Sequence, residues 1–234
     1  MKFREALLSV YRESPCQVLP NALWKTLTFH KDAEALFVMS KGRAKLSNRV
    51  THLEMWKKRR LYVYWDKNRQ KLNLSRQHLR RLKFALIHQD FASAIPDKYL
   101  PIRVPYFRLI THEPDNPPVH PHLPSGFRFA NVKTKIETAL VSDLINQCYA
   151  DIHLTPETVK SWRHHPVFDP RLWIWVVDKR SDTPVGLGIA ELDTRVPEGS
   201  LEWIQVLPAY RRRGLGQAIV QALLSRLHRH VAFA

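Results

Sequence analysis

The stretch LEWIQVLPAYRRRGLGQ, residues 201–217, decides the fold. Its first part, Leu201 to Val206, is a short apolar and β-rich run of strand length. Its last residues open a helix that extends from Gly214 to about His228, whose apolar face is formed by Leu215, Ile219, Ala222, Leu223 and Leu227. The residues between them therefore connect the end of a strand to the start of a helix.

The composition of this connection indicates an anion site. Gly214 and Gly216 allow a ligand to approach the backbone closely, and the first N–H groups of a helix have no partner within the helix. Arg211, Arg212 and Arg213 place positive charge beside the same helix N-terminus, which is unfavourable unless an anion lies there. A phosphate or pyrophosphate ligand is implied, and the alternative is a basic turn before an ordinary helix.

The preceding residues predict the order β-α-α-β-β-β-α. After a strand in FRFANV, residues 127–132, a helix over Ile136 to Tyr149 is expected to bury Ile136, Leu140, Leu144 and Ile145. Thr155-Pro156-Glu157 opens a second helix with an N-cap, a proline in the first turn and an acid. Three strands follow, separated by turns at 182–184 and 197–200; they are Leu172 to Val177, Val185 to Leu192 and Leu201 to Val206.

The spacing Arg211-x-x-Gly214-x-Gly216, after Val206-x-Pro208 at the end of a strand, resembles the acetyl-CoA pyrophosphate loop of the GNAT N-acetyltransferase superfamily. The resemblance covers roughly Gly126 to Phe233. It implies an α/β (α+β) fold in which a mixed, mostly antiparallel sheet is flanked by helices. It also implies transfer of an acetyl group from acetyl-CoA to an amine acceptor.

The same resemblance implies the cofactor-binding residues. Main-chain N–H groups from Arg212 to Gln217 would hold the pyrophosphate, and Ile204 to Val206 would run along the pantetheine arm. The N–H of Val206 would polarise the thioester carbonyl, where negative charge develops during attack. The expected cofactor-binding set is Ile204, Val206, Arg211, Arg212, Arg213, Gly214, Leu215, Gly216 and Gln217.

A carboxylate is the candidate catalytic group. Glu202 lies four residues before Val206, so a two-residue alternation places it on the same face of the strand as Ile204 and Val206. Some members of the family carry a glutamate there, which binds the amine or removes its proton. The alternative is an ion pair with an arginine, and Glu191 is the reserve candidate; Asp193 is expected to be a turn residue.

This sequence departs from the family pattern after the cofactor helix. A GNAT domain normally continues with a fifth strand, a helix carrying the tyrosine that protonates the leaving thiolate, and two further strands. His230 to Phe233 could begin the fifth strand. We expect either a fragment of a longer chain or a truncated product that has lost the usual general acid, and the sequence leaves open whether the truncated chain is active.

The chain is expected to comprise a basic α+β domain at 1–95, a linker at 96–125 and the GNAT-like domain at 126–234. Half of the 16 prolines lie between Pro96 and Pro124, where they prevent long helices and central strands. The first domain is expected to contain helices over Phe3 to Glu13 and Pro20 to Phe29, the latter capped by Asn21. A hairpin of Val50 to Trp56 with Leu61 to Trp65 follows, and then a helix capped by Ser75 with Leu79, Leu82, Leu86 and Ile87 on one face.

Positive charge is concentrated in the first half. The chain carries a net charge of +16; residues 1–125 hold 23 basic and 10 acidic residues, which gives +13. Residues 41–83 alone hold 15 basic and 2 acidic residues, interleaved with Trp56, Tyr62, Tyr64 and Trp65. This composition suits phosphate contacts and base stacking, so the alternative function is a nucleic-acid or polyanion-binding protein with a vestigial GNAT domain.

Other classes of protein are not indicated. No apolar run approaches the roughly 20 residues of a membrane span, and the N-terminus does not fit a secretory signal, so a cytoplasmic location is expected. Cys16 and Cys148 are expected to be reduced, buried thiols. His120-Pro121-His122 and His164-His165 lack partners at ligand spacing, so no metal is expected. Trp162, Trp173, Trp175 and Trp203 are expected in the core, and the alternative is that one of them lines the acceptor site. The sequence leaves the oligomeric state open.

Overall fold

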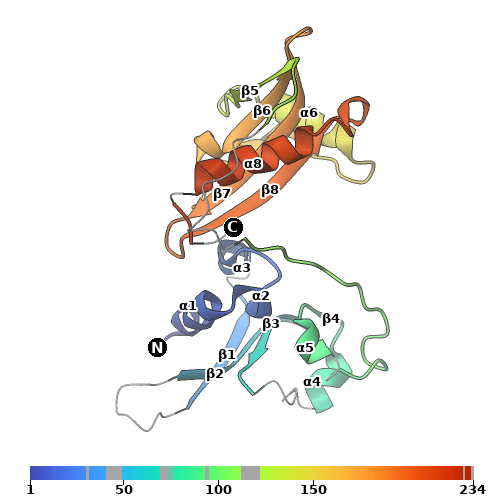
Figure 1. Cartoon of the computed structure of the whole chain (residues 1–234). Helices are drawn as coiled ribbons and strands as arrows, with labels where there is room; N and C mark the ends of the chain where they lie inside the picture. Colours follow the sequence, from blue (N-terminus) through green and yellow to red (C-terminus); the bar gives the residue numbers. More distant parts are fainter. Residues whose placement is uncertain are drawn as a thin grey trace. The chain divides into compact units, whose positions relative to one another are not determined.

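The computed structural model describes residues 1–29, 32–40, 49–68, 74, 76–92, 95–111, 122–228 and 230–232 (Figure 1). It divides the chain into two compact units, Met1–Leu109 and Ile110–Ala234. The division falls inside the proline-rich segment 96–125, of which residues 101–111 have no regular secondary structure. Residues 112–121 of that segment lie outside the described part.

The first unit combines short helices with a sheet of order β1-β2-β3-β4. β1 and β2 are antiparallel, as are β2 and β3, whereas β4 runs parallel to β3. Its elements in chain order are α1 (Phe3–Glu13), α2 (Pro15–Val18), α3 (Leu23–Phe29), β1 (Glu34–Ser40), β2 (Arg49–Lys57), β3 (Arg60–Asp66), α4 (Arg76–Arg81), β4 (Phe84–Ala85) and α5 (Gln89–Ala92).

Two predictions for the first unit are confirmed. α1 has the predicted bounds and buries Ala6, Leu7, Val10 and Tyr11 at helical spacing. The predicted hairpin is β2–β3, and its turn contains Lys58 with φ of +57°, so a lysine takes the left-handed position that glycine usually fills.

Three predictions for the first unit are wrong. The second helix begins at Leu23, and the Asn21 side chain instead accepts a hydrogen bond from Tyr106 Oη at 3.2 Å. α4 ends at Arg81, so Leu86 and Ile87 are not on it, because residues 84–85 pair with β3 as a strand. Cys16 is exposed rather than buried. Ser75, the predicted cap, lies outside the described residues.

A buried group of charged side chains links β2 to β3. His52 Nε2 lies 2.8 Å from Glu54 Oε1, and His52 Nδ1 lies 3.0 Å from Asp66 Oδ2. Burial lowers the pKa of His52, but the hydrogen bonds and charges of Glu54 and Asp66 raise it by more, so that it lies above 6.5. Burial raises the pKa of Glu54, but bonds from His52 and Trp56 lower it by more, so that it lies below 4.5.

These pKa shifts predict how the stability of the protein depends on pH. The contribution of His52 is fully present below pH 6.5 and is lost as the pH rises through its folded-state pKa. The contribution of Glu54 is present above pH 4.5 and is lost as the pH falls through its own folded-state pKa. Urea unfolding midpoints of the wild type should therefore fall more steeply than those of His52→Gln as the pH rises above 6.5. Parallel curves would contradict this account.

The second unit contains a sheet of order β5-β6-β7-β8 in which every neighbouring pair is antiparallel. Its element order is the predicted one. The elements are β5 (Phe127–Asn131), α6 (Thr138–Cys148), α7 (Pro156–Trp162), the 3₁₀ turn η1 (Pro170–Leu172), β6 (Trp173–Asp178), β7 (Thr183–Asp193), β8 (Glu198–Val206), the 3₁₀ turn η2 (Pro208–Tyr210) and α8 (Leu215–Leu227).

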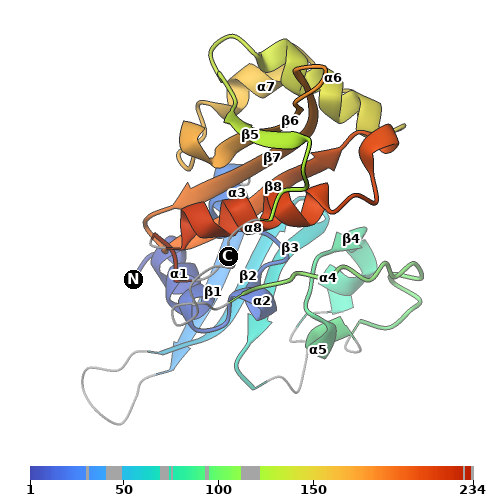
Figure 2. The same cartoon turned by 45° about the horizontal axis from the view of Figure 1, so that its top comes forward.

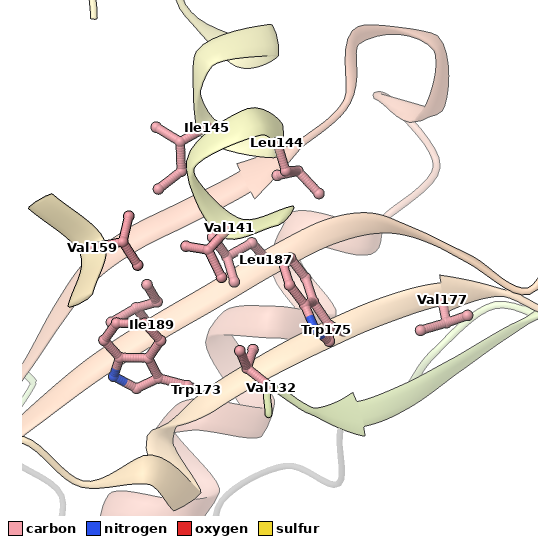
Figure 3. Packing of buried hydrophobic residues seen from close by; sticks show 10 residues of the cluster. All are labelled: Val132, Val141, Leu144, Ile145, Val159, Trp173, Trp175, Val177, Leu187 and Ile189. Carbon is pink, nitrogen blue, oxygen red and sulfur yellow. The ribbon is translucent and has the colours of Figure 1, made fainter. Parts of the chain in front are cut away.

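Helices cover both faces of this sheet. Figure 2 shows α8 lying along one face, where Leu215, Ile219 and Leu223 pack against Ile174 and Val176 of β6. Figure 3 shows the other face, where side chains of α6 and α7 point toward the strands. That cluster contains Val132, Val141, Leu144, Ile145, Val159, Trp173, Trp175, Val177, Leu187 and Ile189. The sheet is therefore the centre of a two-sided core, and the predicted apolar face of α8 is confirmed.

Three predictions for the second unit need correction. Ile136 precedes α6 and is 74% exposed, and Leu140 is 41% exposed; Val141 lies in the buried face instead. The turn expected at 197–200 lies at 194–197 instead, because β8 begins at Glu198, which is buried. Residues 230–232 do not form a strand, although Ala232 N–H donates to Pro197 O at 2.7 Å.

The two units share an order of elements that the sequence did not reveal. In each, helices precede three strands of an antiparallel meander, and a helix follows the third strand. α4 thus follows β3 as α8 follows β8. The sequence between β3 and α4, residues 67–75, contains no glycine, whereas the connection to α8 contains Gly214. Of these two connections, only the one to α8 contains glycines that allow a ligand to approach the backbone closely.

Candidate functional site

β8 is an edge strand of the sheet in the described part of the chain, and it contains a bulge at Glu202. Trp203 lies opposite Ile189 of β7 and Leu201 opposite Ala190, so Glu202 has no opposite residue. Leu201 and Ile204 both pack with the cluster under α8, whereas Trp203 packs with the cluster under α6. The bulge therefore interrupts the two-residue alternation on which the placement of Glu202 was based.

The register gives the direction of the Val206 N–H group. Leu207 N–H donates to Val185 O at 3.0 Å. Hydrogen-bonded and non-hydrogen-bonded pairs alternate along an antiparallel ladder, so the adjacent pair, Val206 with Gly186, does not exchange hydrogen bonds. Its N–H and C=O therefore point away from β7, toward the open edge. Consistent with this, Val206 O accepts a hydrogen bond from Arg211 Nε at 3.1 Å rather than from β7.

The turn that opens α8 contains two residues in the left-handed region. Arg212 has φ of +64° and Gly214 has φ of +78°. Left-handed residues in such turns direct successive N–H groups toward one point and form anion-binding concavities. Gly214 is the N-cap of α8, and no described side chain caps the helix. A Cβ atom at Gly214 or Gly216 would meet nothing within 4 Å, so both positions leave space for a close ligand.

The three arginines of this turn have different surroundings. The Arg211 guanidinium donates to Val206 O and, at 3.2 Å, to Cys148 O at the end of α6, so it ties the turn to two other elements. Arg213 donates to Ala209 O at 3.3 Å, and its guanidinium lies 5.2 Å from the centre of the Tyr210 ring. Arg212 is exposed. Burial raises the pKa of the Cys148 thiol, and the Arg211 charge lowers it by less.

Two glycines of β7 bring α8 close to the sheet. Gly186 lies opposite Val206 and Gly188 opposite Ile204. A Cβ atom on Gly188 would overlap Ile219 Cγ2 and would lie 3.0 Å from Ile174 Cγ1. The helix therefore packs directly against the strand backbone, which fixes the start of α8 beside the end of β8. Sequence reasoning missed these glycines, although two glycines within one strand indicate close backbone approach.

The reserve carboxylate lies on β7. Glu191 is 8% exposed, and its Oε1 lies 3.5 Å from His165 Nδ1. Glu202 is half-buried on β8. Asp193 is the last residue of β7, is 3% exposed and binds Arg195 through both carboxylate oxygens, so it supports the turn after the strand.

Several aromatic side chains lie together on the α6 side of β8, and the sequence did not identify which ones. The Trp203 and Trp162 rings are stacked with centres 5.4 Å apart, and the Tyr149 ring meets Trp203 edge-on at 6.4 Å. Gln205 Nε2 donates to Tyr149 Oη at 3.1 Å. Trp173 and Trp175 are buried as predicted, but Trp162 and Trp203 keep partial exposure. A sequence signal existed, since Trp203 and Gln205 alternate along one face of the strand.

Among the ranges that the structure describes, no three His, Cys, Asp or Glu side chains are placed to hold a metal ion. No helix there is both long and apolar enough to cross a bilayer.

Comparison with known proteins links the second unit to a family. Residues 139–233 match the model of the acetyltransferase (GNAT) family. A GCN5-related N-acetyltransferase from Sphaerobacter thermophilus is similar in structure, with a TM-score of 0.61, 16% identity, and coverage of 84% of this chain and 68% of that protein. This likeness shows the fold. No match was found among curated protein sequences.

Two other solved structures show weaker likeness. A putative acetyltransferase from Pyrococcus horikoshii has a TM-score of 0.39 and 22% identity, covering 47% of this chain and 37% of its own. A protein from Drosophila has a TM-score of 0.48 and 12% identity, covering 98% of this chain and 84% of its own.

Proposed function

Because residues 139–233 are a domain of the acetyltransferase (GNAT) family, we propose that the protein transfers the acetyl group of acetyl-CoA to the amino group of an acceptor. The observation that carries the proposal is the outward N–H of Val206 beside the glycine turn that opens α8. The two features lie at consecutive positions along one connection. One is suited to a developing negative charge, and the other to the phosphates of the donor.

The donor would be held by backbone groups. N–H groups from Arg212 to Gln217 would bind the pyrophosphate, with Arg211 and Arg213 supporting the turn and Leu215 anchoring the helix in the core. Ile204 and Val206 would contact the pantetheine arm along the open edge of β8. Acetyl-CoA supplies an acetyl group that is activated as a thioester.

The acetyl transfer needs one hydrogen-bond donor and one general base from this chain. The Val206 N–H would donate to the carbonyl oxygen as negative charge develops there. Glu202 would take the proton that the acceptor amine loses as its nitrogen forms the new C–N bond. The C–S bond breaks, and the thiolate of CoA takes up a proton, so the products are an amide and CoA.

A glutamine at position 202 tests the role of the carboxylate. Glu202→Gln is expected to lower kcat/KM for an amine acceptor by about 100-fold, because general-base catalysis contributes roughly that much. Acetyl-CoA affinity should change by less than about twofold, since backbone groups hold the donor. The measurement is release of the CoA thiol by the full-length protein with a panel of amines, over a range of pH.

Two further variants show whether a loss of activity is specific to Glu202. Glu157→Gln on the exposed part of α7 is the matched control and should retain full activity. If Glu191→Gln loses turnover while Glu202→Gln keeps it, the base is Glu191 and the assignment of Glu202 is wrong. Absence of CoA release by the wild type with every amine, despite donor binding, would contradict the proposed reaction.

A further inference from the structure

Two basic segments of the first unit meet in the fold, where Arg59 contacts Arg81, 22 residues further along the chain. Lys58 and Arg59 form the turn between β2 and β3, and Arg81 ends α4. Arg59 Nε donates to Arg81 O at 2.7 Å, and Lys83 N–H donates to Arg59 O at 3.0 Å. The parallel pairing of β3 with β4 extends this contact. The hairpin turn and the end of α4 therefore form one continuous surface.

This basic surface consists of exposed cationic side chains: Lys58, Arg59, Arg60, Arg80, Arg81 and Lys83. The segments that form it, 57–65 and 76–89, contain no acidic residue. The neighbouring carboxylates Glu54 and Asp66 are bound to His52 at 2.8 Å and 3.0 Å. Both carboxylates are thus paired with His52, and Glu54 is buried. The surface has the electrostatic character of a phosphate-binding site.

An exposed aromatic ring lies within the basic surface. Phe84 is 38% exposed, its ring centre lies 5.8 Å from that of Tyr62, and the Arg60 guanidinium lies 5.9 Å from it. Cations beside an accessible aromatic ring are the combination that holds unpaired bases, because every base can stack on an aromatic face while the cations follow the backbone. An acidic peptide without aromatic side chains would use the charges alone, and a lipid surface would bury the ring rather than stack on its face, so stacking on Phe84 is the feature specific to nucleic acid.

We propose that this basic surface binds single-stranded nucleic acid. The surface is formed by residues of the first unit alone, and the proposal does not depend on acetyl transfer. Phosphates would contact Lys58, Arg80 and Lys83, and a base would stack on Phe84.

Fluorescence anisotropy with a labelled oligonucleotide tests the proposal on the full-length protein. RNA and DNA single strands of roughly 12 nucleotides and a DNA duplex of the same length would be titrated at several salt concentrations. Both single strands should bind more tightly than the duplex, and the RNA and DNA arms identify the preferred sugar. The slope of log K against log salt should be about −2 to −4, as expected for about three to five phosphate contacts.

Charge-reversal variants locate the site. The triple variant Lys58→Glu, Arg80→Glu, Lys83→Glu is expected to bind single strands at least about 100-fold more weakly. Its matched control is Lys135→Glu, Lys160→Glu, Lys179→Glu, which makes the same charge change at exposed positions of the second unit and should retain most of the affinity. Equal loss in both variants would mean attraction by net charge alone and would overturn the proposal.

Substitution of the ring separates stacking from charge. Phe84→Leu keeps an apolar side chain but removes the stacking face, and should weaken single-strand binding by about tenfold with no change for heparin. Retention of acetyl-CoA binding and of the circular dichroism spectrum would show that each variant is folded. Duplex binding as tight as single-strand binding, with no effect of Phe84→Leu, would overturn the proposal.

Discussion

Gly216→Glu is expected to lower the affinity for acetyl-CoA by at least about 100-fold. The new carboxylate would lie in the first turn of α8, where the N–H groups are proposed to bind the pyrophosphate. Two like charges about 4 Å apart near a protein surface repel by roughly 4 kcal/mol, which exceeds the 2.7 kcal/mol or so that a 100-fold loss requires. The measurement is isothermal calorimetry with acetyl-CoA.

The fold should survive this substitution. A Cβ atom at Gly216 meets nothing within 4 Å, and its φ is not among the positive values of the chain. A carboxylate near a helix N-terminus also stabilises the helix. The melting temperature of Gly216→Glu should therefore equal or exceed that of the wild type. A loss of acetyl-CoA binding without a loss of stability would show that the new carboxylate repels the ligand and does not unfold the protein.

Matched variants complete the test. Gln221→Glu adds the same charge in the middle of α8 and should keep wild-type affinity, whereas Gly216→Ala should show a smaller loss than the glutamate. Wild-type affinity in Gly216→Glu would mean that the donor does not bind at this turn.

Gly188→Ala is expected to destabilise the protein by about 1–3 kcal/mol, the range for overpacking a close-packed core. Its Cβ would overlap Ile219 Cγ2 and would lie 3.1 Å from Leu223 Cδ1, so α8 must move away from β7. Because Gly188 lies opposite Ile204, that movement would also displace the start of α8 from the end of β8. Lower urea midpoints and weaker acetyl-CoA binding should appear together.

A second substitution distinguishes overlap from other effects of alanine. Ile219→Ala removes the atom that Gly188→Ala would meet, so the double variant should be less destabilised than the sum of the single variants. Gly216→Ala adds a methyl group into open space and should leave the free energy of unfolding within about 0.5 kcal/mol of the wild type. If the losses in free energy of unfolding were additive in the double variant, α8 would not be in close contact with β7 at Gly188.

Local sequence signals predicted the second unit well where packing and local chemistry agree. Thr155 caps α7 by accepting a hydrogen bond from Thr158 N–H, as its position before Pro156 indicated. The apolar face of α8 is the one that its spacing predicted. The glycine turn between β8 and α8 also lies where the sequence placed it, because left-handed backbone at Gly214 is a requirement that composition reveals.

The features that the sequence did not predict depend on contacts between residues far apart in the chain. The bulge at Glu202 depends on the register against β7, and register is not encoded in a single strand. Leu140 fits the helical period but is exposed, because the sheet packs against Val141 instead. The meeting of Arg59 with Arg81 likewise depends on the parallel pairing of β3 and β4, which joins segments that are far apart in the sequence.

Titration of the full-length protein with acetyl-CoA in a calorimeter tests the central claim most directly. The account predicts saturable binding of one molecule per chain, at the connection to α8 with its two glycines, and a Kd within the range of roughly 1 µM to 1 mM that is typical of KM values. Saturable binding that is lost in Gly216→Glu would place the donor at this turn. No binding by a chain that circular dichroism shows to be folded would contradict the account.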